Sequence, residues 1–138
     1  LGKLPEGKNM IFDGIPRTSH QAELLMALLD KYERQYKAVL IDIAKDTALT
    51  RLTTRRVCKD CKTVYAVNHE GDNCKCGGEL MTRADDNPEA IQKRLDTYEN
   101  ETVPAINKFE DKLIKINGEP VIEKVQELAV EALNTVIG

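Results

Sequence analysis

The chain has 138 residues, of which 41% are hydrophobic, and this fits about one domain with a modest core. Its net charge of −3 and pI near 5.5 argue against general attraction to nucleic acid or to a membrane surface, since both favour a cationic protein. No apolar run approaches the roughly 18 residues of a membrane-spanning helix, and no signal peptide is visible. We therefore expect a protein that binds neither nucleic acid nor membrane.

In chain order, the first half of the sequence predicts strands that alternate with helices. A short buried strand is expected over residues 9–13, followed by a helix over residues 19–36 in which leucines recur at helical spacing. The continuous apolar run over residues 38–43 is typical of a strand that is buried on both faces in a parallel sheet. Asp46 is expected to cap the helix that comes next.

The second half continues this alternation after a cysteine-rich insertion. A helix is expected over residues 88–110, capped by Asn87 and interrupted near Pro104. A third strand is predicted over residues 113–117, and the last helix is expected to begin at Pro120. Strands that alternate with helices predict an α/β fold with a doubly wound parallel sheet, here a narrow one of three strands.

The insertion over residues 58–82 contains the only four cysteines of the chain. Their paired spacing is Cys58-x2-Cys61 followed by Cys74-x-Cys76. Four thiolates in tetrahedral geometry would bind a structural zinc ion, which replaces the hydrophobic core that so short an insertion cannot build. We expect this insertion to form a small zinc-binding lid, with residues 1–57 and 83–138 as the core domain.

Other interpretations of the cysteines remain open. The second pair is one residue tighter than the commoner spacing, so His69 or Asp72 is an alternative for one ligand. Two disulfides, or four unrelated thiols, would also use four cysteines, but their spacing in an acidic chain without a visible signal peptide favours a metal, and hence a reducing compartment.

The arginines are placed where a phosphate site would require them. Five of the seven gather around the predicted strand ends and the insertion: Arg17, Arg51, Arg55, Arg83 and Arg94. The planar guanidinium group binds phosphate through two hydrogen bonds, so the joint pattern favours phosphoryl transfer. For any one arginine taken alone, an exposed surface salt bridge is the simpler explanation.

A polar segment follows the first predicted strand, where ligands bind in open α/β sheets. It runs Asp13-Gly14-Ile15-Pro16-Arg17-Thr18, with Gln21 three residues later. A carboxylate, a tight turn, a cation and an amide therefore meet at one place. Thr18 and Gln21 also match a helix capping box, which is a sufficient structural reason for the glutamine.

Four motifs in this order resemble the adenylate kinase family, and more closely its bacterial type whose lid binds zinc. They are Phe12–Thr18 with Gln21, Arg51–Cys58, Thr82–Asp86 and Lys93–Leu95. The resemblance implies the fold of the P-loop nucleoside-monophosphate kinases and a cytoplasmic monomer. It also implies reversible phosphoryl transfer from ATP, bound with Mg²⁺, to AMP, which yields two ADP.

The same resemblance implies roles for individual residues. Asp13 would help to hold Mg²⁺. The AMP-binding residues would be Gly14, Ile15, Pro16, Arg17 and Gln21, with Arg17 on the phosphate and the Gln21 amide at the adenine edge.

The ATP-binding residues implied by the resemblance would be Arg51, Arg55, the backbone of Val64 and Tyr65, and the carbonyl of Glu119. Arg55, Arg83 and Arg94 would surround the transferring phosphoryl group, and the last two would also touch the AMP phosphate. Asp85 and Asp86 would keep the arginines in register.

The resemblance also implies parts that this sequence does not contain. The family's first strand, its glycine-rich phosphate loop and its helical AMP-binding flap would precede Leu1. We therefore expect this chain, by itself, to have an incomplete sheet, to fold poorly and to be inactive. Two alternatives are a related nucleoside-monophosphate kinase with another acceptor, and a non-catalytic zinc-bearing module that binds nucleotides.

Overall fold

The computed structural model describes residues 8–65, 69 and 71–137. The chain divides into two compact units, one made of Leu1–Asp42 and Asp96–Gly138 and the other of Ile43–Leu95. Residues 66–68 and 70 of the expected lid lie outside the described residues, as does the start of the chain at Leu1.

The sheet of the first unit consists of two parallel strands. Strand β1 (Ala38–Asp42) pairs with β5 (Leu113–Asn117) in a register that runs from Ala38 opposite Leu113 to Asp42 opposite Asn117. Gly118 extends the ladder by donating its N–H to the carbonyl of Asp42 at 2.8 Å. Both strands were predicted from their apolar runs, and the parallel pairing confirms an α/β fold with a parallel sheet.

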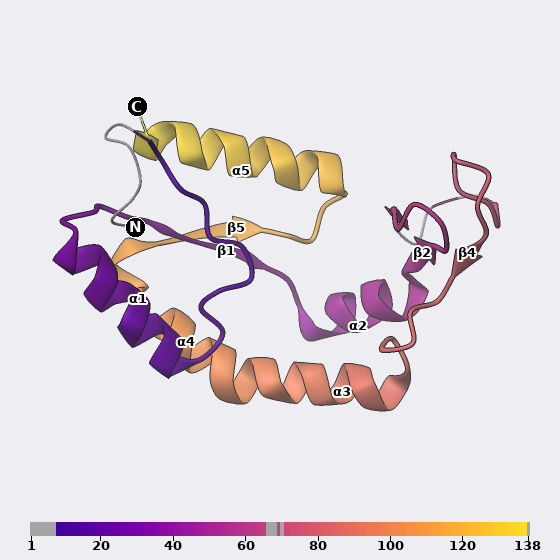
Figure 1. Cartoon of the computed structure of the whole chain (residues 1–138), viewed down its shortest axis with the longest axis horizontal. Helices are drawn as coiled ribbons and strands as arrows, with labels where there is room; N and C mark the ends of the chain where they lie inside the picture. The colour runs from indigo at the N-terminus through magenta and orange to yellow at the C-terminus, as the bar shows by residue number, and fades with distance from the viewer. Residues whose placement is uncertain (1–7, 66–68, 70, 138) are drawn as a thin grey trace. The chain divides into compact units, whose positions relative to one another are not determined.

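Helices lie on both sides of this strand pair (Figure 1). Helix α5 (Ile122–Ile137) covers one side, and helices α1 (Ser19–Lys31) and α4 (Val103–Asn107) lie together on the other. Helix α5 begins two residues later than predicted, because the first helical bonds are accepted by the Val121 carbonyl, from Lys124 at 3.0 Å and Val125 at 3.1 Å. None of the helices in the described part of the chain is long and apolar enough to cross a membrane.

Helix α1 has the expected beginning but ends earlier than predicted. Thr18 caps it, because its hydroxyl accepts a hydrogen bond from the N–H of Gln21 at 3.3 Å. The helix was expected to reach residue 36, but it ends at Lys31 because Glu33 adopts the left-handed conformation with φ +49°. Arg34 then donates its N–H to the Leu29 carbonyl at 2.9 Å, which closes the end of the helix.

The long helix expected over residues 88–110 is divided, as the proline predicted. Asn87 caps α3 (Pro88–Thr97) by accepting a hydrogen bond from the N–H of Ala90 at 2.9 Å. A π-helical segment over Tyr98–Thr102 follows and leads into α4, where Pro104 lies in the first turn. A proline has no N–H to donate, so its best place is such a first turn. Helix α4 ends at Asn107, three residues before the predicted end.

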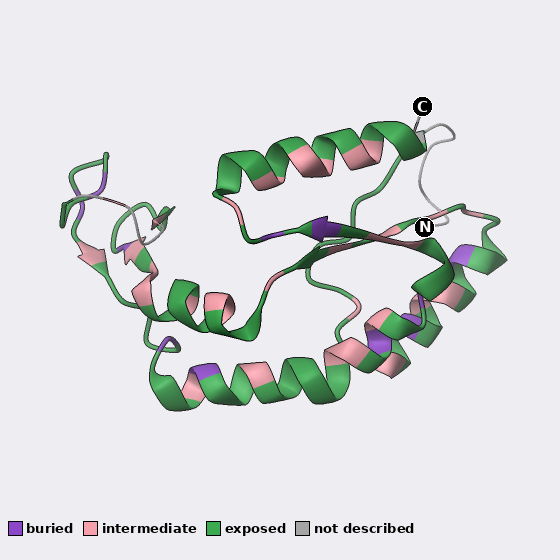
Figure 2. Cartoon of the chain, turned by 180° about the vertical axis from the view of Figure 1, so that it is seen from behind, coloured by how far each residue is buried: buried purple, intermediate pink, exposed green. Residues whose placement is uncertain are grey.

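The core of the first unit is small and lies where α1 and α4 meet. Ala22 and Ala105 are fully buried, which allows the two helices to approach closely, and Phe109 is only 6% exposed. The Phe109 ring packs edge-on against Tyr36, with ring centroids 6.0 Å apart. Ala38 of β1 packs against the same cluster, so the helices are joined to the sheet. Few other residues are buried (Figure 2).

The first predicted strand is absent. Residues 9–13 have no strand conformation, and Ile11 is 90% exposed. A strand needs a neighbour that accepts its backbone hydrogen bonds, and among the described residues no strand pairs with this segment. The prediction was therefore wrong, although the sequence pattern is that of a buried strand.

The second unit contains helix α2 (Lys45–Thr54) and a small antiparallel sheet. The sheet has the order β3 (Val64–Tyr65), β2 (Arg56–Cys58), β4 (Leu80–Met81). Asp46 does not cap α2, because the N-cap position is Ala44 and no side chain caps it. Asp46 lies instead in the first turn, where a negative charge suits the helix dipole.

Replacing Phe109 with alanine should lower the free energy of unfolding by about 3 kcal/mol, because a buried aromatic side chain is lost and a cavity remains. Urea unfolding followed by circular dichroism would measure the change. Phe109→Leu is the matched control and should cost about 1 kcal/mol, since it retains most of the apolar volume. Equal and small losses for both variants would contradict this account of the core.

Candidate functional site

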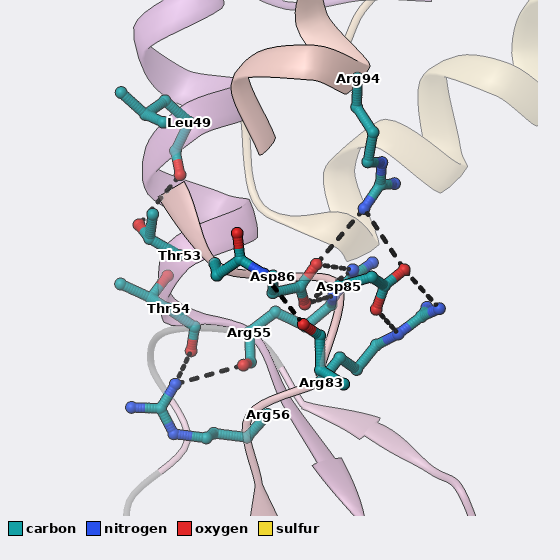
Figure 3. A network of polar contacts seen from close by, with 11 residues as sticks. Leu49, Thr53, Thr54, Arg55, Arg56, Arg83, Asp85, Asp86 and Arg94 are labelled. Carbon is teal, nitrogen blue, oxygen red and sulfur yellow. Dashed lines mark hydrogen bonds and ion pairs between the residues drawn. The ribbon is translucent and has the colours of Figure 1, made fainter. Parts of the chain in front are cut away.

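A buried carboxylate organises the polar network of the second unit. Asp86 lies between β4 and α3, and its side chain is fully buried. Arg55, directly after α2, binds it through three contacts: Nε to Oδ2 at 2.9 Å, and Nη2 to Oδ1 at 2.6 Å and to Oδ2 at 2.8 Å (Figure 3). Charge-assisted, forked hydrogen bonds of this kind are what a buried carboxylate requires in place of water.

Two further arginines, Arg83 and Arg94, contact Asp86 or its neighbour Asp85. Arg94, on α3, places Nη1 3.3 Å from Oδ1 of Asp86 and 4.0 Å from Oδ2 of Asp85. Arg83 binds Asp85 in parallel, with Nε to Oδ1 at 2.9 Å and Nη2 to Oδ2 at 3.0 Å. Burial raises the pKa of Asp85, but its own backbone N–H and then Arg83 and Arg94 outweigh burial and lower the pKa.

The network has an excess of positive charge that faces solvent. Three arginines surround two aspartates, so the cluster carries about one net positive charge. The side chains of Arg83 and Arg94 are 45% and 46% exposed, whereas that of Arg55 is 19% exposed. The structure thus brings together Arg55, Arg83 and Arg94, as predicted, and leaves two of them open to an anion.

Arg51 and Arg56 lie close to this cluster along the chain. Arg51 is exposed on α2, one turn before Arg55. Arg56 is also exposed, and its Nη1 donates only to backbone, to the carbonyls of Thr54 at 3.3 Å and Arg55 at 3.2 Å. Arg56 is therefore a neighbouring arginine outside the aspartate network.

The polar segment at residues 13–21 belongs to the first unit and forms a compact turn. Gly14 has φ +78°, and a Cβ there would lie 3.2 Å from Nη2 of Arg17, so a glycine is required. Arg17 folds back so that its Nε donates to the Gly14 carbonyl at 2.8 Å, and the Ile15–Pro16 peptide is cis. Gln21 accepts a hydrogen bond from the N–H of Arg17 at 2.7 Å.

The rest of the first unit holds this turn in place. Thr102, in the π-helical segment, donates its hydroxyl to the Arg17 carbonyl at 3.0 Å. Asp13 is exposed at the beginning of the turn. Glu119, the predicted contact for ATP in this unit, follows β5 and donates its N–H to Oδ1 of Asn117 at 3.0 Å.

The four cysteine sulfurs of the second unit lie within 4.8 Å of one another. Three of the distances are 3.5 Å from Cys58 to Cys76, 3.4 Å from Cys61 to Cys74 and 3.5 Å from Cys76 to Cys61. Zinc–sulfur bonds of about 2.3 Å in a regular tetrahedron give sulfur–sulfur distances of about 3.8 Å. The donor set therefore fits a zinc ion, and all four residues are free cysteines rather than disulfides.

Neither alternative ligand joins this group among the described residues. His69 instead stacks on the ring of Tyr65, with centroids 4.1 Å apart, and its Nε2 lies 3.3 Å from the carbonyl oxygen of Asn73. Asp72 is exposed and accepts, through its backbone carbonyl, the N–H of Leu80 at 3.0 Å. The tight second pair of cysteines is therefore accommodated without a substitute ligand.

Tight turns bring the cysteines together. Cys74 donates its N–H to the Gly78 carbonyl at 2.7 Å and accepts at its own carbonyl from Gly77, which has φ +88°, at 2.8 Å. Gly78 is buried, and a Cβ there would clash with the Asp60 carboxylate and lie 2.8 Å from the sulfur of Cys58. Only glycine permits this approach of the backbone to the sulfurs.

The surroundings divide the thiols by their acidity. Hydrogen bonds from Thr63, and then from Cys74 and Cys76, lower the pKa of Cys61 to about 6. The backbone N–H of Gly78 lowers the pKa of Cys76, but the neighbouring sulfurs of Cys74, Cys61 and Cys58 outweigh it and raise the pKa to about 12. Four adjacent thiolates repel one another, so complete deprotonation requires a cation among them.

Residues 1–114 match the adenylate kinase family model. The chain belongs to the adenylate kinase family. Curated relatives named adenylate kinase include a protein of Chlamydia trachomatis serovar D, 37% identical over 127 residues, which are 90% of this chain and 52% of the relative. A Geobacillus relative is 41% identical over 126 residues, 86% of this chain and 58% of the relative. A Clostridium perfringens relative is 36% identical over 133 residues, 91% of this chain and 62% of the relative.

This adenylate kinase family chain spans about half the length of the curated relatives it matches, between 50% and 62% of them. The aligned part includes Arg55, Arg83, Arg94 and the four cysteines, since the family model extends through residue 114. The membership therefore rests on the parts of the chain that contain the described network.

Sequence reasoning missed one feature of the metal centre. The hydroxyl groups of Thr63 and Tyr65 each lie 3.1 Å from a cysteine sulfur, that of Cys61 and that of Cys74 respectively. The signal available in the sequence was the alternation of two hydroxyl residues, two positions apart, directly after the first cysteine pair.

Replacing Asp86 with asparagine should lower the free energy of unfolding by about 3 kcal/mol, because the arginines then lose the charge that compensates them at a buried site. The matched control is Asp85→Asn, which removes the same charge from a half-exposed carboxylate and should shift the urea midpoint little. Similar midpoints for both variants would show that burial of Asp86 does not control this network.

Proposed function

We propose that the protein transfers a phosphoryl group reversibly between ATP and AMP, with two ADP as products. The observation that carries the proposal is the convergence of Arg55, Arg83 and Arg94 on two aspartates, in a chain that belongs to the adenylate kinase family. Relatives named adenylate kinase support the same activity.

The arginine cluster would stabilise the transferring group. In phosphoryl transfer, negative charge is spread over the three equatorial oxygens of a loose transition state, and positioned cations supply most of the catalysis. Arg55 is fixed by its forked bonds to Asp86, while Arg83 and Arg94 are half exposed and can exchange an aspartate oxygen for a phosphate oxygen. No covalent intermediate on the protein is needed.

The turn at residues 13–21 would bind the acceptor. Gly14, Ile15, Pro16, Arg17 and Gln21 are the residues proposed to hold AMP. Arg17 now gives one guanidinium N–H to the Gly14 carbonyl and has others with which to bind a phosphate. The carbonyl oxygen of the Gln21 side chain is held by the N–H of Arg17, which orients the amide nitrogen as a donor toward the adenine edge.

The cysteine-rich insertion would act as a lid over ATP. Cys58, Cys61, Cys74 and Cys76 would hold a structural zinc ion, which supplies folding free energy to residues 58–82 in place of an apolar core. The ATP contacts proposed are Arg51, Arg55, the backbone of Val64 and Tyr65, and the carbonyl of Glu119. Asp13 would help to hold the Mg²⁺ that accompanies ATP. Closure would exclude water, so that AMP rather than water receives the phosphoryl group.

The larger architecture is part of the same proposal. Residues 1–57 and 83–138 would form the core of a doubly wound sheet, and residues 58–82 the lid. The acting protein would be a monomer with ATP, ADP and AMP as its partners.

Replacing Arg55 with lysine in the complete polypeptide, as it is encoded, should lower kcat about a hundredfold, because a point charge cannot replace the forked guanidinium on a developing phosphoryl charge. A coupled assay with ATP and AMP measures the loss. Arg56→Lys is the matched control, since the Arg56 side chain donates to the backbone carbonyls of Thr54 and Arg55, and it should retain kcat within about threefold. The same assay with CMP, UMP and GMP identifies the acceptor, and faster turnover with any of these would favour the related kinases instead. Equal kcat values for the two variants would refute the role of Arg55.

The freshly purified chain should contain one equivalent of zinc, measured by metal analysis. The zinc should be released as the pH falls, because protons compete with the metal for the thiolate sulfurs. The Cys58→Ser variant is the matched comparison and should retain less zinc at every pH, because serine does not supply the soft thiolate ligand. Less than half an equivalent in the unaltered chain would contradict the metal assignment.

A further inference from the structure

We propose that the hydroxyl groups of Thr63 and Tyr65 are positioning groups for the metal centre, and that they donate hydrogen bonds to the sulfurs of Cys61 and Cys74. This inference rests on the proposed zinc site and adds to it two residues outside the ligand set. It also gives the tyrosine side chain a role that is separate from the nucleotide contact proposed for its backbone.

The two contacts have the geometry of hydrogen bonds to sulfur. Oγ1 of Thr63 lies 3.1 Å from Sγ of Cys61, and Oη of Tyr65 lies 3.1 Å from Sγ of Cys74. Thr63 immediately precedes β3, and Tyr65 is the last residue of that strand. Residues two apart in an extended segment project to the same side. One short segment therefore serves one cysteine of each pair.

The direction of these hydrogen bonds follows from the chemistry of the partners. The Tyr65 oxygen already accepts the backbone N–H of Lys75 at 3.1 Å, so the hydroxyl proton is available for the sulfur. A metal-bound cysteine is a thiolate without a proton, so in the loaded site the oxygen must be the donor. The second argument also applies to Thr63: a metal-bound Cys61 has no proton, so the Thr63 hydroxyl must be the donor.

Tyr65 is held in this position from several sides. Its backbone is paired with Arg56 in the antiparallel ladder of β2 and β3. Its ring is stacked on His69, with centroids 4.1 Å apart and an angle of 43° between the planes. His69, which could have been a metal ligand, thus supports the tyrosine that contacts one. A fixed donor loses little conformational freedom when it bonds to the sulfur.

These hydrogen bonds would affect the charge on the sulfurs as well as the strength of metal binding. A divalent ion with four thiolates carries two excess negative charges, and hydrogen bonds to the sulfurs withdraw part of that charge. Loss of a donor should therefore weaken metal binding and also make the remaining thiolate more electron-rich. A purely structural contact would produce the first effect without the second.

The test measures metal affinity in the full chain with the variants Tyr65→Phe, Thr63→Val and both together. Zinc dissociation constants come from competition with a chromophoric chelator. We expect each single variant to bind zinc about tenfold more weakly, the lower end of the range for residues that support metal ligands. The matched controls are Tyr32→Phe and Thr135→Val, which remove the same groups in the first unit, where Thr135 bonds to its own helix. Their zinc affinity should stay within about twofold.

Cobalt substitution separates the positioning role from a loss of folding. Co²⁺ bound to four thiolates gives sulfur-to-metal charge-transfer bands, and loss of a hydrogen-bond donor should move these bands to lower energy in Tyr65→Phe and Thr63→Val. Alkylation of the zinc-loaded variants by iodoacetamide should also be faster, because the thiolates are more nucleophilic.

The outcomes distinguish this inference from the proposal on which it rests. If the unaltered chain binds no zinc, both the metal site and the role of the hydroxyls are overturned. If the unaltered chain binds one tetrahedral metal ion, but both variants keep its affinity within twofold and its charge-transfer energy, only the present inference is overturned. A weaker affinity with unchanged band energy and alkylation rate would likewise overturn it, because the groups would then serve packing alone.

Discussion

A carboxylate that is buried among arginines is the constraint on which the second unit depends. The side chain of Asp86 is fully buried, which is unfavourable for an ionised carboxylate unless cations and hydrogen bonds replace water. Arg55, directly after α2, and Arg94, on α3, supply them, so the same contacts join the segments that precede and follow the small sheet. The network that stabilises this unit is thus also the network that presents Arg83 and Arg94 to solvent, so the side chains proposed to bind phosphate also contribute to stability.

The cysteine-rich region differs from the arginine network in what can stabilise it. Among its described residues, those that are buried are Cys58, Cys74 and Gly78 rather than large apolar side chains, so these residues bury little hydrocarbon. A metal ion held by four sulfurs would replace that contribution, and the glycine turns exist because the backbone must approach the sulfurs. The hydroxyl groups of Thr63 and Tyr65 fit this interpretation, because a centre with excess negative charge needs donors around it.

The sequence predicted those parts of the fold that depend on neighbouring residues. Strands β1 and β5 follow from apolar runs, and the caps at Thr18 and Asn87 follow from side chains that reach the helix N–H groups close to them. The failures share a different origin. The segment at residues 9–13 has the composition of a strand but no described partner, and Asp46 has the chemistry of a cap but lies two residues after the N-cap position. Pairing and exact helix ends depend on the rest of the fold, which local patterns do not contain.

The candidate site also contains features that the sequence predicts and features that it does not. Arg55, Arg83 and Arg94 were identified because a family motif fixes their order, and the structure places all three on two aspartates. The contact of Tyr65 with Cys74 joins residues nine apart in the sequence, and no spacing rule describes this pairing. Motifs therefore locate the residues that are proposed to perform chemistry, whereas the contacts proposed to adjust the charge on the sulfurs were found in the structure. Tyr65 lies in the strand whose backbone is proposed to contact ATP, and Thr63 immediately precedes that strand, so a change at Tyr65 would affect both the proposed metal centre and the proposed nucleotide contact. The separation of these effects requires measurements on the metal itself rather than on activity alone.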